Sequence, residues 1–154
     1  MKTDLNFLER GVTLLEILIA LAVITILAAV VLPGFGKVRK IQVLKSATEN
    51  IVSVIEKARS QTLSSLDSSV YGIHFGSSSA VIFMGSSYDP NSGTNEVVGI
   101  ISPATISGGT LYNGSVYFNR LSGLPSTTGN IIVSVPGMSS KTITISSFGH
   151  ASSD

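Results

Sequence analysis

The feature that most constrains this chain is an apolar run of 21 residues, from Val12 to Leu32, with one charged side chain, Glu16. As an α-helix the run is about 31 Å long at ~1.5 Å per residue, enough to cross a hydrocarbon core of about 30 Å. A carboxylate inside such a segment costs roughly 2.5 to 3.5 kcal/mol on insertion scales. The sequence therefore predicts a membrane helix whose glutamate requires a partner.

A secretory signal peptide and a plain single-pass anchor are the simpler interpretations of this run. A signal peptide has an apolar core of about 7 to 15 residues followed by a small-residue cleavage site. The candidate site, Ala20-Leu21-Ala22, lies in the middle of the run, and the run continues directly into helical periodicity. A signal peptide is therefore disfavoured, and a plain anchor remains open on these residues alone.

The segment Gly11-Val12-Thr13-Leu14-Leu15-Glu16-Ile17-Leu18 follows a short leader with Lys2 and Arg10, and the apolar helix ends Leu32-Pro33-Gly34-Phe35. This arrangement resembles the class III signal of type IV pilins and type II secretion pseudopilins. In that family a prepilin peptidase cuts after the glycine on the cytoplasmic side and methylates the new amino terminus. The resemblance thus implies a leader that is removed and an apolar helix that stays in the protein.

Carried onto this sequence, the resemblance places cleavage between Gly11 and Val12, with valine where the family usually has phenylalanine. It implies assembly roles for Glu16 and for Pro33, since the family has a helix-bending proline at the latter position. A carboxylate four residues after the new ammonium group can neutralise that group on an adjacent, axially staggered subunit. The alternative for Glu16, a place at the headgroup boundary, remains open.

Charge is sparse and unevenly distributed. Charged residues make up 12% of the chain, about half of the ~25% that is usual. Of the 10 Lys and Arg and 9 Asp and Glu, only five fall in residues 68–154: Asp89, Glu96, Arg120, Lys141 and Asp154. This part offers no electrostatic footprint for nucleic acid, so no nucleic-acid partner is expected. The absence of cysteine excludes disulfides, thiolate metal sites and cysteine nucleophiles.

Pro33-Gly34-Phe35-Gly36 should kink or loosen the helix, because proline removes a ladder hydrogen bond and glycine has low helix propensity. Beyond it, apolar residues at three- and four-residue spacing predict an amphipathic stem helix. They are Val38, Ile41, Leu44, Ala47, Ile51, Val54, Ile55, Ala58, Thr62, Leu63 and Leu66. Packing on the chain's own sheet is the commoner role for such a stripe, with a coiled-coil seam or partner groove as alternatives.

From Asp67 onward, short apolar runs set in Ser, Gly, Thr, Asn and Pro predict strands and turns. The predicted strands are Val70–Phe75, Ala80–Met84, Glu96–Ile101, Ser115–Phe118, Asn130–Val135 and Lys141–Ser146, with turns at Gly76–Ser79 and Pro136-Gly137. The last strand alternates strictly, as an antiparallel strand with one wet face does.

The predicted fold class is α+β and pilin-like, with a long hydrophobic then amphipathic helix packed on a C-terminal antiparallel sheet. The expected boundaries are a cleaved leader at 1–11, a transmembrane and assembly helix at 12–33, a stem helix at 34–66 and a β-rich domain at 67–154.

Catalytic and metal motifs are not apparent. His74 and His150 are the histidines, and no Gly-x-Ser-x-Gly elbow, phosphate-binding loop or His-Glu-x-x-His occurs. No enzyme activity, cofactor or metal is therefore expected. Asp89–Glu96 offers oxygen ligands for calcium, but a Pro/Gly hairpin loop is the favoured interpretation. Asn113-Gly114-Ser115 matches the glycosylation sequon, and a turn is favoured there too.

Three further segments, Ala58-Arg59-Ser60, Phe118–Gly123 and Ser146–Gly149, are similar to the type II secretion protein H and FimT group of minor pseudopilins. The combined resemblance implies a structural minor subunit of a type IV pilus or type II secretion pseudopilus. It implies prepilin peptidase, other pilin or pseudopilin subunits and inner-membrane lipid as partners, with a single span and the C-terminal domain outside the cytoplasm. A DNA-uptake minor pilin, a membrane-anchored binding module and an anchored hydrolase are the alternatives.

Overall fold

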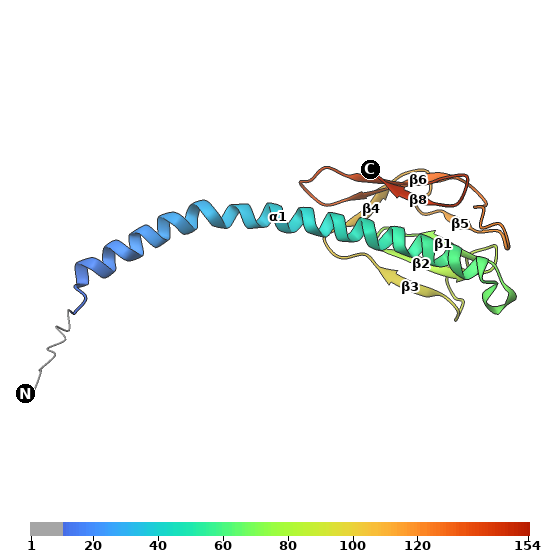
Figure 1. The fold of residues 1–154 in the computed structure, drawn as a ribbon, viewed down its shortest axis with the longest axis horizontal. Coiled ribbons are helices and arrows are strands. Elements are labelled where there is room, and N and C mark those ends of the chain that lie inside the picture. The colour runs from blue at the N-terminus through green and yellow to red at the C-terminus, as the bar shows by residue number, and fades with distance from the viewer. Residues whose placement is uncertain (1–10) are drawn as a thin grey trace, which may run out of the picture. The chain divides into compact units, whose positions relative to one another are not determined.

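The computed structural model describes residues 11–154, except for the side chains of residues 32–34. The predicted leader, with Lys2 and Arg10, therefore lies almost entirely outside the described residues. The chain divides into two compact units, with the boundary between Val38 and Arg39. One helix, α1 (Leu14–Leu63), contributes to both units (Figure 1).

Helix α1 begins with a polar cap and stays helical through the segment where a kink or loosening is predicted. The backbone N–H of Glu16 donates to Thr13 Oγ1 at 3.2 Å, which satisfies one of the unpaired donors of the first turn. The helical backbone continues across Pro33, so the hydrophobic and amphipathic segments belong to one long helix, as predicted. The Pro33 side chain is outside the described residues, and its assembly role stays a prediction.

The helix ends at Leu63, three residues before the predicted end of the stem, and a short 3-10 turn, η1 (Leu66–Ser68), follows it. Ser65, Asp67 and Ser68 all have positive φ in this turn. The left-handed conformation reverses the chain tightly and directs it into the first strand.

The second unit contains two four-stranded antiparallel sheets. In the first sheet the strand order is β3-β2-β1-β5, and in the second it is β4-β6-β7-β8. The strands are β1 (Tyr71–Phe75), β2 (Ser79–Met84), β3 (Glu96–Gly99), β4 (Thr105–Gly108), β5 (Ser115–Tyr117), β6 (Gly129–Ser134), β7 (Lys141–Ile145) and β8 (Ala151–Ser153). Figure 1 shows the second half of α1 running along these sheets.

All six predicted strands are present, and both predicted turns join antiparallel neighbours. At the β6–β7 connection, Met138 N donates to Val135 O at 3.0 Å and Gly137 has φ 78°, the conformation that a type II turn requires after proline. The alternation of β7 is confirmed, since Ile143 and Ile145 are buried while Thr144 is exposed.

Two features of the sheets differ from the prediction. The single predicted sheet is in fact two, and strands β4 and β8 had been assigned to connecting segments. Both strands are short and rich in Ser, Thr or Gly, so their pairing depends on their neighbours rather than on their own pattern. Strand β4 also contains a bulge between Ile106 and Gly108.

The core of the second unit joins one stripe of α1 to both sheets. The stripe buries Leu44, Ala47, Ile51, Val54, Ile55 and Ala58. From the sheets it meets Ile73, Phe75 and Ile82 of the first and Ile131, Val133 and Ile143 of the second. The prediction that the amphipathic stripe packs on the chain's own strands is confirmed, and so is the α+β fold class.

Candidate functional site

The predicted cleavage point lies in irregular, exposed backbone. Residues Gly11 to Thr13 precede α1, and the Val12 side chain is 65% exposed. A protease needs accessible backbone outside regular structure, and the bond between Gly11 and Val12 lies in such backbone. Cleavage between Gly11 and Val12 and methylation of Val12 remain predictions that fit this local geometry.

Glu16 lies in the first turn of α1. The pattern Thr13-x-x-Glu16 has the spacing of a capping box, and the hydrogen bond from Glu16 N to Thr13 Oγ1 is half of that arrangement. A carboxylate in the first turn also interacts favourably with the helix dipole. Sequence reasoning missed this local role, although the spacing was visible. The pairing of Glu16 with a neighbouring subunit's amino terminus stays a prediction.

The helix after Glu16 has apolar side chains on every face, and they are exposed. The most exposed large ones are Val30 at 76% and Ile26 at 66%. α1 is long and apolar enough to cross a membrane, and no residue of its most apolar stretch is buried within the chain. A helix that is apolar all round requires lipid or other apolar helices around it.

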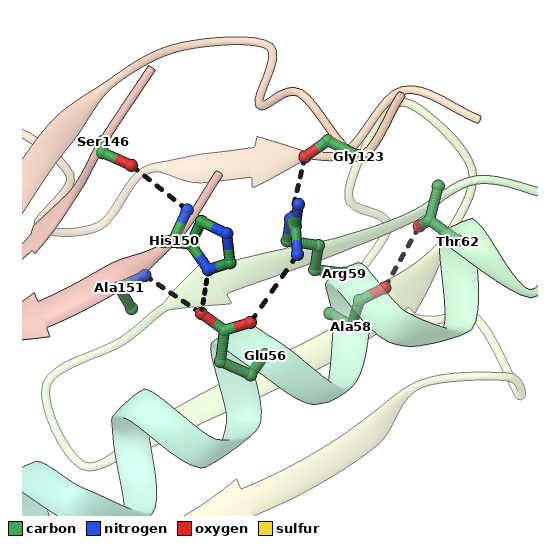
Figure 2. A network of polar contacts seen from close by, with 8 residues as sticks. All are labelled: Glu56, Ala58, Arg59, Thr62, Gly123, Ser146, His150 and Ala151. Carbon is green, nitrogen blue, oxygen red and sulfur yellow. Dashed lines mark hydrogen bonds and ion pairs between the residues drawn. The ribbon is translucent and has the colours of Figure 1, made fainter. Parts of the chain in front are cut away.

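Figure 2 shows a polar junction where α1 meets the second sheet. Glu56 Oε1 accepts a hydrogen bond from the backbone N–H of Ala151 at 3.1 Å and lies 3.5 Å from His150 Nδ1. Its other oxygen is 4.0 Å from Arg59, and Arg59 Nε donates to the Gly123 carbonyl oxygen at 3.2 Å. Strand β8 lies at the edge of the second sheet. The Glu56 carboxylate binds the backbone N–H of Ala151, which another strand could otherwise pair with.

Thr62, placed on the apolar stripe by the sequence, has a polar function in the fold. It is fully buried, and its hydroxyl group donates to Ala58 O at 3.1 Å. Thr62 Oγ1 also accepts a hydrogen bond from Tyr71 N at 2.8 Å and lies 3.3 Å from Tyr71 O. Thr62 therefore joins the last turn of α1 to the start of β1.

The three segments that resemble minor pseudopilins meet at this junction. A Cβ added at Gly149 would overlap the Gly123 carbonyl oxygen and lie 3.0 Å from Arg59 Nε. A Cβ at Gly123 would lie 3.1 Å from both Arg59 Nε and Leu63 Cδ2. Both glycines have positive φ, at 64° and 81°. Arg59, Gly123 and Gly149 therefore form one contact, which sequence spacing alone could not reveal; we call it the Arg59 latch.

His74 lies beside a serine and a tyrosine. His74 Nδ1 lies 2.9 Å from Ser115 Oγ because the two residues are cross-strand partners in β1 and β5. The Tyr88 ring stacks on the imidazole with centroids 4.1 Å apart, and burial lowers the pKa of His74. Within residues 11–154, no carboxylate is hydrogen-bonded to His74, so the third member of a triad is lacking there.

The two candidate ligand or modification segments are turns. In the Asp89–Glu96 loop, Asp89 Oδ1 accepts from Asn91 N at 2.9 Å, and its carbonyl oxygen accepts from Asn95 Nδ2 at 2.7 Å. Across residues 11–154, no three His, Asp or Glu side chains are grouped as metal ligands. At Asn113, φ is 54°, and Gly114 N donates to Leu111 O at 2.9 Å, which confirms a turn there.

Comparisons with known proteins agree with this geometry. Residues 7–32 match the family described as the prokaryotic N-terminal methylation motif. The structure is similar to the crystal structure of the type IV minor pilin FimU of Pseudomonas aeruginosa, with a TM-score of 0.55 and 16% identity. That similarity covers 72% of this chain and 92% of the other. No curated protein sequence matches the chain.

The chain thus combines the N-terminal methylation motif with a fold like that of type IV pilins. Such proteins are in general structural rather than enzymatic. The methylation motif overlaps a helix that is long and apolar enough to be a membrane anchor.

Proposed function

We propose that the chain is a minor subunit of a type IV pilus or type II secretion pseudopilus, without catalytic activity of its own. The observation that carries the proposal is α1 itself. The methylation motif at residues 7–32 overlaps a helix whose large apolar side chains are exposed along the first half, whereas most of those in the second half pack on the sheets. Such a helix fits a subunit whose apolar half lies first in the membrane and later among the helices of other subunits.

In this proposal the leader lies in the cytoplasm and the sheet domain on the other side of the membrane. Prepilin peptidase cuts between Gly11 and Val12, and the apolar helix leaves the bilayer to pack with other pilin helices. The Glu16 carboxylate then neutralises the ammonium group of a neighbouring Val12. Both charges would be costly alone in a low-dielectric bundle, and together they compensate each other.

The test is recovery of the chain with assembled fibres. Fibres are sheared or purified from cells with and without prepilin peptidase, and the chain is detected with an antibody against its sheet domain. We expect recovery only from cells that have the peptidase. A chain that stays entirely in the membrane fraction of peptidase-positive, fibre-producing cells would favour the membrane-anchored binding module instead.

A further inference from the structure

The outer backbone edge of β3 is unpaired. Strand β3 lies at the edge of the first sheet, beside β2 (Figure 1). Just beyond the strand, Ile100 N donates to Ser78 O at 2.9 Å, and alternate residues of an antiparallel strand face the same neighbour. The backbone groups of Val98 therefore face β2, whereas those of Val97 and Gly99 face away from it. Within the described part of the chain, Val97 and Gly99 make no backbone hydrogen bond outside the β2–β3 pair.

The other three edges of the two sheets are partly occupied by the chain itself. At β5, Ser126 N donates to Tyr117 O at 2.8 Å, and Tyr117 N donates to Ser126 Oγ at 3.1 Å. At β4, Ile106 N donates to Ser77 O at 2.9 Å. At β8, Glu56 accepts the outward N–H. Among the described residues β3 has no such cover, so its edge differs from the rest.

The side chains of β3 do not protect this edge either. Natural edge strands are commonly protected by outward charges, proline or a bulge. Strand β3 contains no proline, and its register with β2 is continuous. Its one charged side chain, Glu96, forms an ion pair with Lys57 of α1. Val97 is 65% exposed, and a Cβ at Gly99 would meet nothing within 4 Å. The edge is therefore regular, largely apolar and open.

The unpaired groups define the chemistry of an occupant. Donors and acceptors that repeat along an extended backbone are matched by another extended polypeptide, which adds to the sheet as a further strand. On the outer face of the sheet, Val97 lies beside Val81, and the next position on β3, Gly99, has no side chain. A glycine in a strand often marks the close approach of another backbone, and an aromatic neighbour can cover it. The edge thus suits an extended segment with a bulky apolar residue.

A second copy of this chain does not suit the edge. A closed pair of identical β3 strands is antiparallel, with a twofold axis perpendicular to the sheet. The second half of α1 runs along the sheets, so this axis would direct the α1 helices of the two copies in opposite senses (Figure 1). Subunits that share one membrane or one bundle have their helices in the same direction. The added strand therefore comes from a different polypeptide.

We propose that the β3 edge binds an extended apolar segment of a different protein chain as an added strand. The pairing uses the outward N–H and C=O groups of Val97 and Gly99. In a fibre, that chain is a neighbouring subunit. The choice of a different chain, and of a neighbouring subunit, rests on the proposed function, whereas the open edge itself does not.

A synthetic peptide tests the edge directly. In the probe, valine and threonine alternate around one phenylalanine, lysine stands at both ends, and every second amide is N-methylated so that only one edge can pair. The full-length chain is held in phospholipid nanodiscs, and binding is followed by the fluorescence anisotropy of labelled peptide. We expect binding, together with slower hydrogen exchange at the amides of Val97 and Gly99. A fully N-methylated peptide with the same side chains lacks every backbone donor and should bind roughly tenfold more weakly or worse.

Matched variants locate the contact. Val97→Pro removes an outward N–H, and proline is tolerated at such edge positions. It should weaken binding of the probe by roughly tenfold or more, whereas Val97→Thr should leave it nearly unchanged. Denaturation midpoints show whether both variants are folded, and the two peptides on the wild-type chain decide the question if the proline variant is not. No binding, equal binding of the two peptides, or equal binding to a folded Val97→Pro chain would overturn the proposal.

Recovery with fibres separates this inference from the proposed function. The folded Val97→Pro chain should be recovered in smaller amounts than the Val97→Thr chain, and equal recovery would overturn the assignment of the added strand to a neighbouring subunit. If the probe does not bind and the wild-type chain is recovered with fibres, the β3 site fails and the proposed function stands. If the probe binds and the wild-type chain is absent from fibres, the proposed function fails and the strand-addition site stands.

Discussion

The two halves of α1 contain similar apolar residues and bury them very differently. In the first half Ile24 is 61% exposed, and in the second half Ile55 is fully buried. The first half is apolar on all faces, so no single surface could cover it. The second half has most of its apolar residues on one stripe, which the two sheets cover from Leu44 to Ala58. The stability of the second half is thus a property of this chain, while that of the first half depends on lipid or on other subunits.

The largest effect is expected at the head of the exposed half. Glu16→Ala removes one member of the proposed intersubunit pair and leaves the Val12 ammonium without a partner in the bundle. Since breaking a buried pair costs about 3 to 5 kcal/mol, recovery with fibres should fall by roughly a hundredfold or more. Membrane insertion and leader removal should be unchanged, as fractionation and intact mass will show. Normal recovery of the variant would mean that the glutamate has no pairing role.

The second prediction compares the same substitution, isoleucine to alanine, in the two halves of α1. Ile55→Ala removes a fully buried side chain and should lower the free energy of unfolding of the sheet domain by about 2 to 5 kcal/mol. Ile24→Ala, the matched change in the exposed half, should not alter it. Chemical denaturation of the detergent-solubilised chain measures both. An equal loss from the two substitutions would contradict the division of α1.

The sequence predicted most of this fold because its strongest patterns are local. The stripe of the stem helix, the alternation of β7 and the Pro136-Gly137 turn each determine structure within a few residues. Strand β8 could not be predicted in this way, because Ala151-Ser152-Ser153 has no apolar alternation. Its position depends on β7 and on the distant Glu56, which accepts the N–H of Ala151.

The sequence likewise predicts only the part of the candidate site that lies within one short segment. Gly11, Val12 and Glu16 lie within one short motif, so the sequence could predict roles for them, and those roles stay predictions. The Arg59 latch joins residues from three distant segments, and only the fold reveals that a side chain at Gly149 would collide with backbone and that one at Gly123 would crowd Arg59 and Leu63. The spacing of Thr13 and Glu16 indicates a helix cap, but the sequence patterns were interpreted only as a processing motif at these residues.

The smallest predicted effect is a pH dependence confined to the second unit. Burial lowers the pKa of His74, whose ring faces Tyr88 and Ser115. The folded domain therefore binds this proton less readily than the unfolded chain does. The stability that the domain has with a neutral His74 is fully present above the pKa of about 6.5 of the unfolded chain. It is lost as the pH falls through the lower pKa that His74 has in the folded domain. Denaturation midpoints of wild type and His74→Asn between about pH 7 and pH 5 should converge toward the acid end. Parallel curves would contradict this assignment.

The most direct test of the account is the intact mass of the mature chain extracted from the membranes of cells with an active prepilin peptidase. If the exposed half of α1 is kept for transfer into a fibre, the protein should begin at Val12 with one added methyl group. The same chain from peptidase-deficient cells should retain Met1 to Gly11. Retention of Met1 in cells with the active peptidase would contradict the account, because the apolar half would then belong to a permanent anchor.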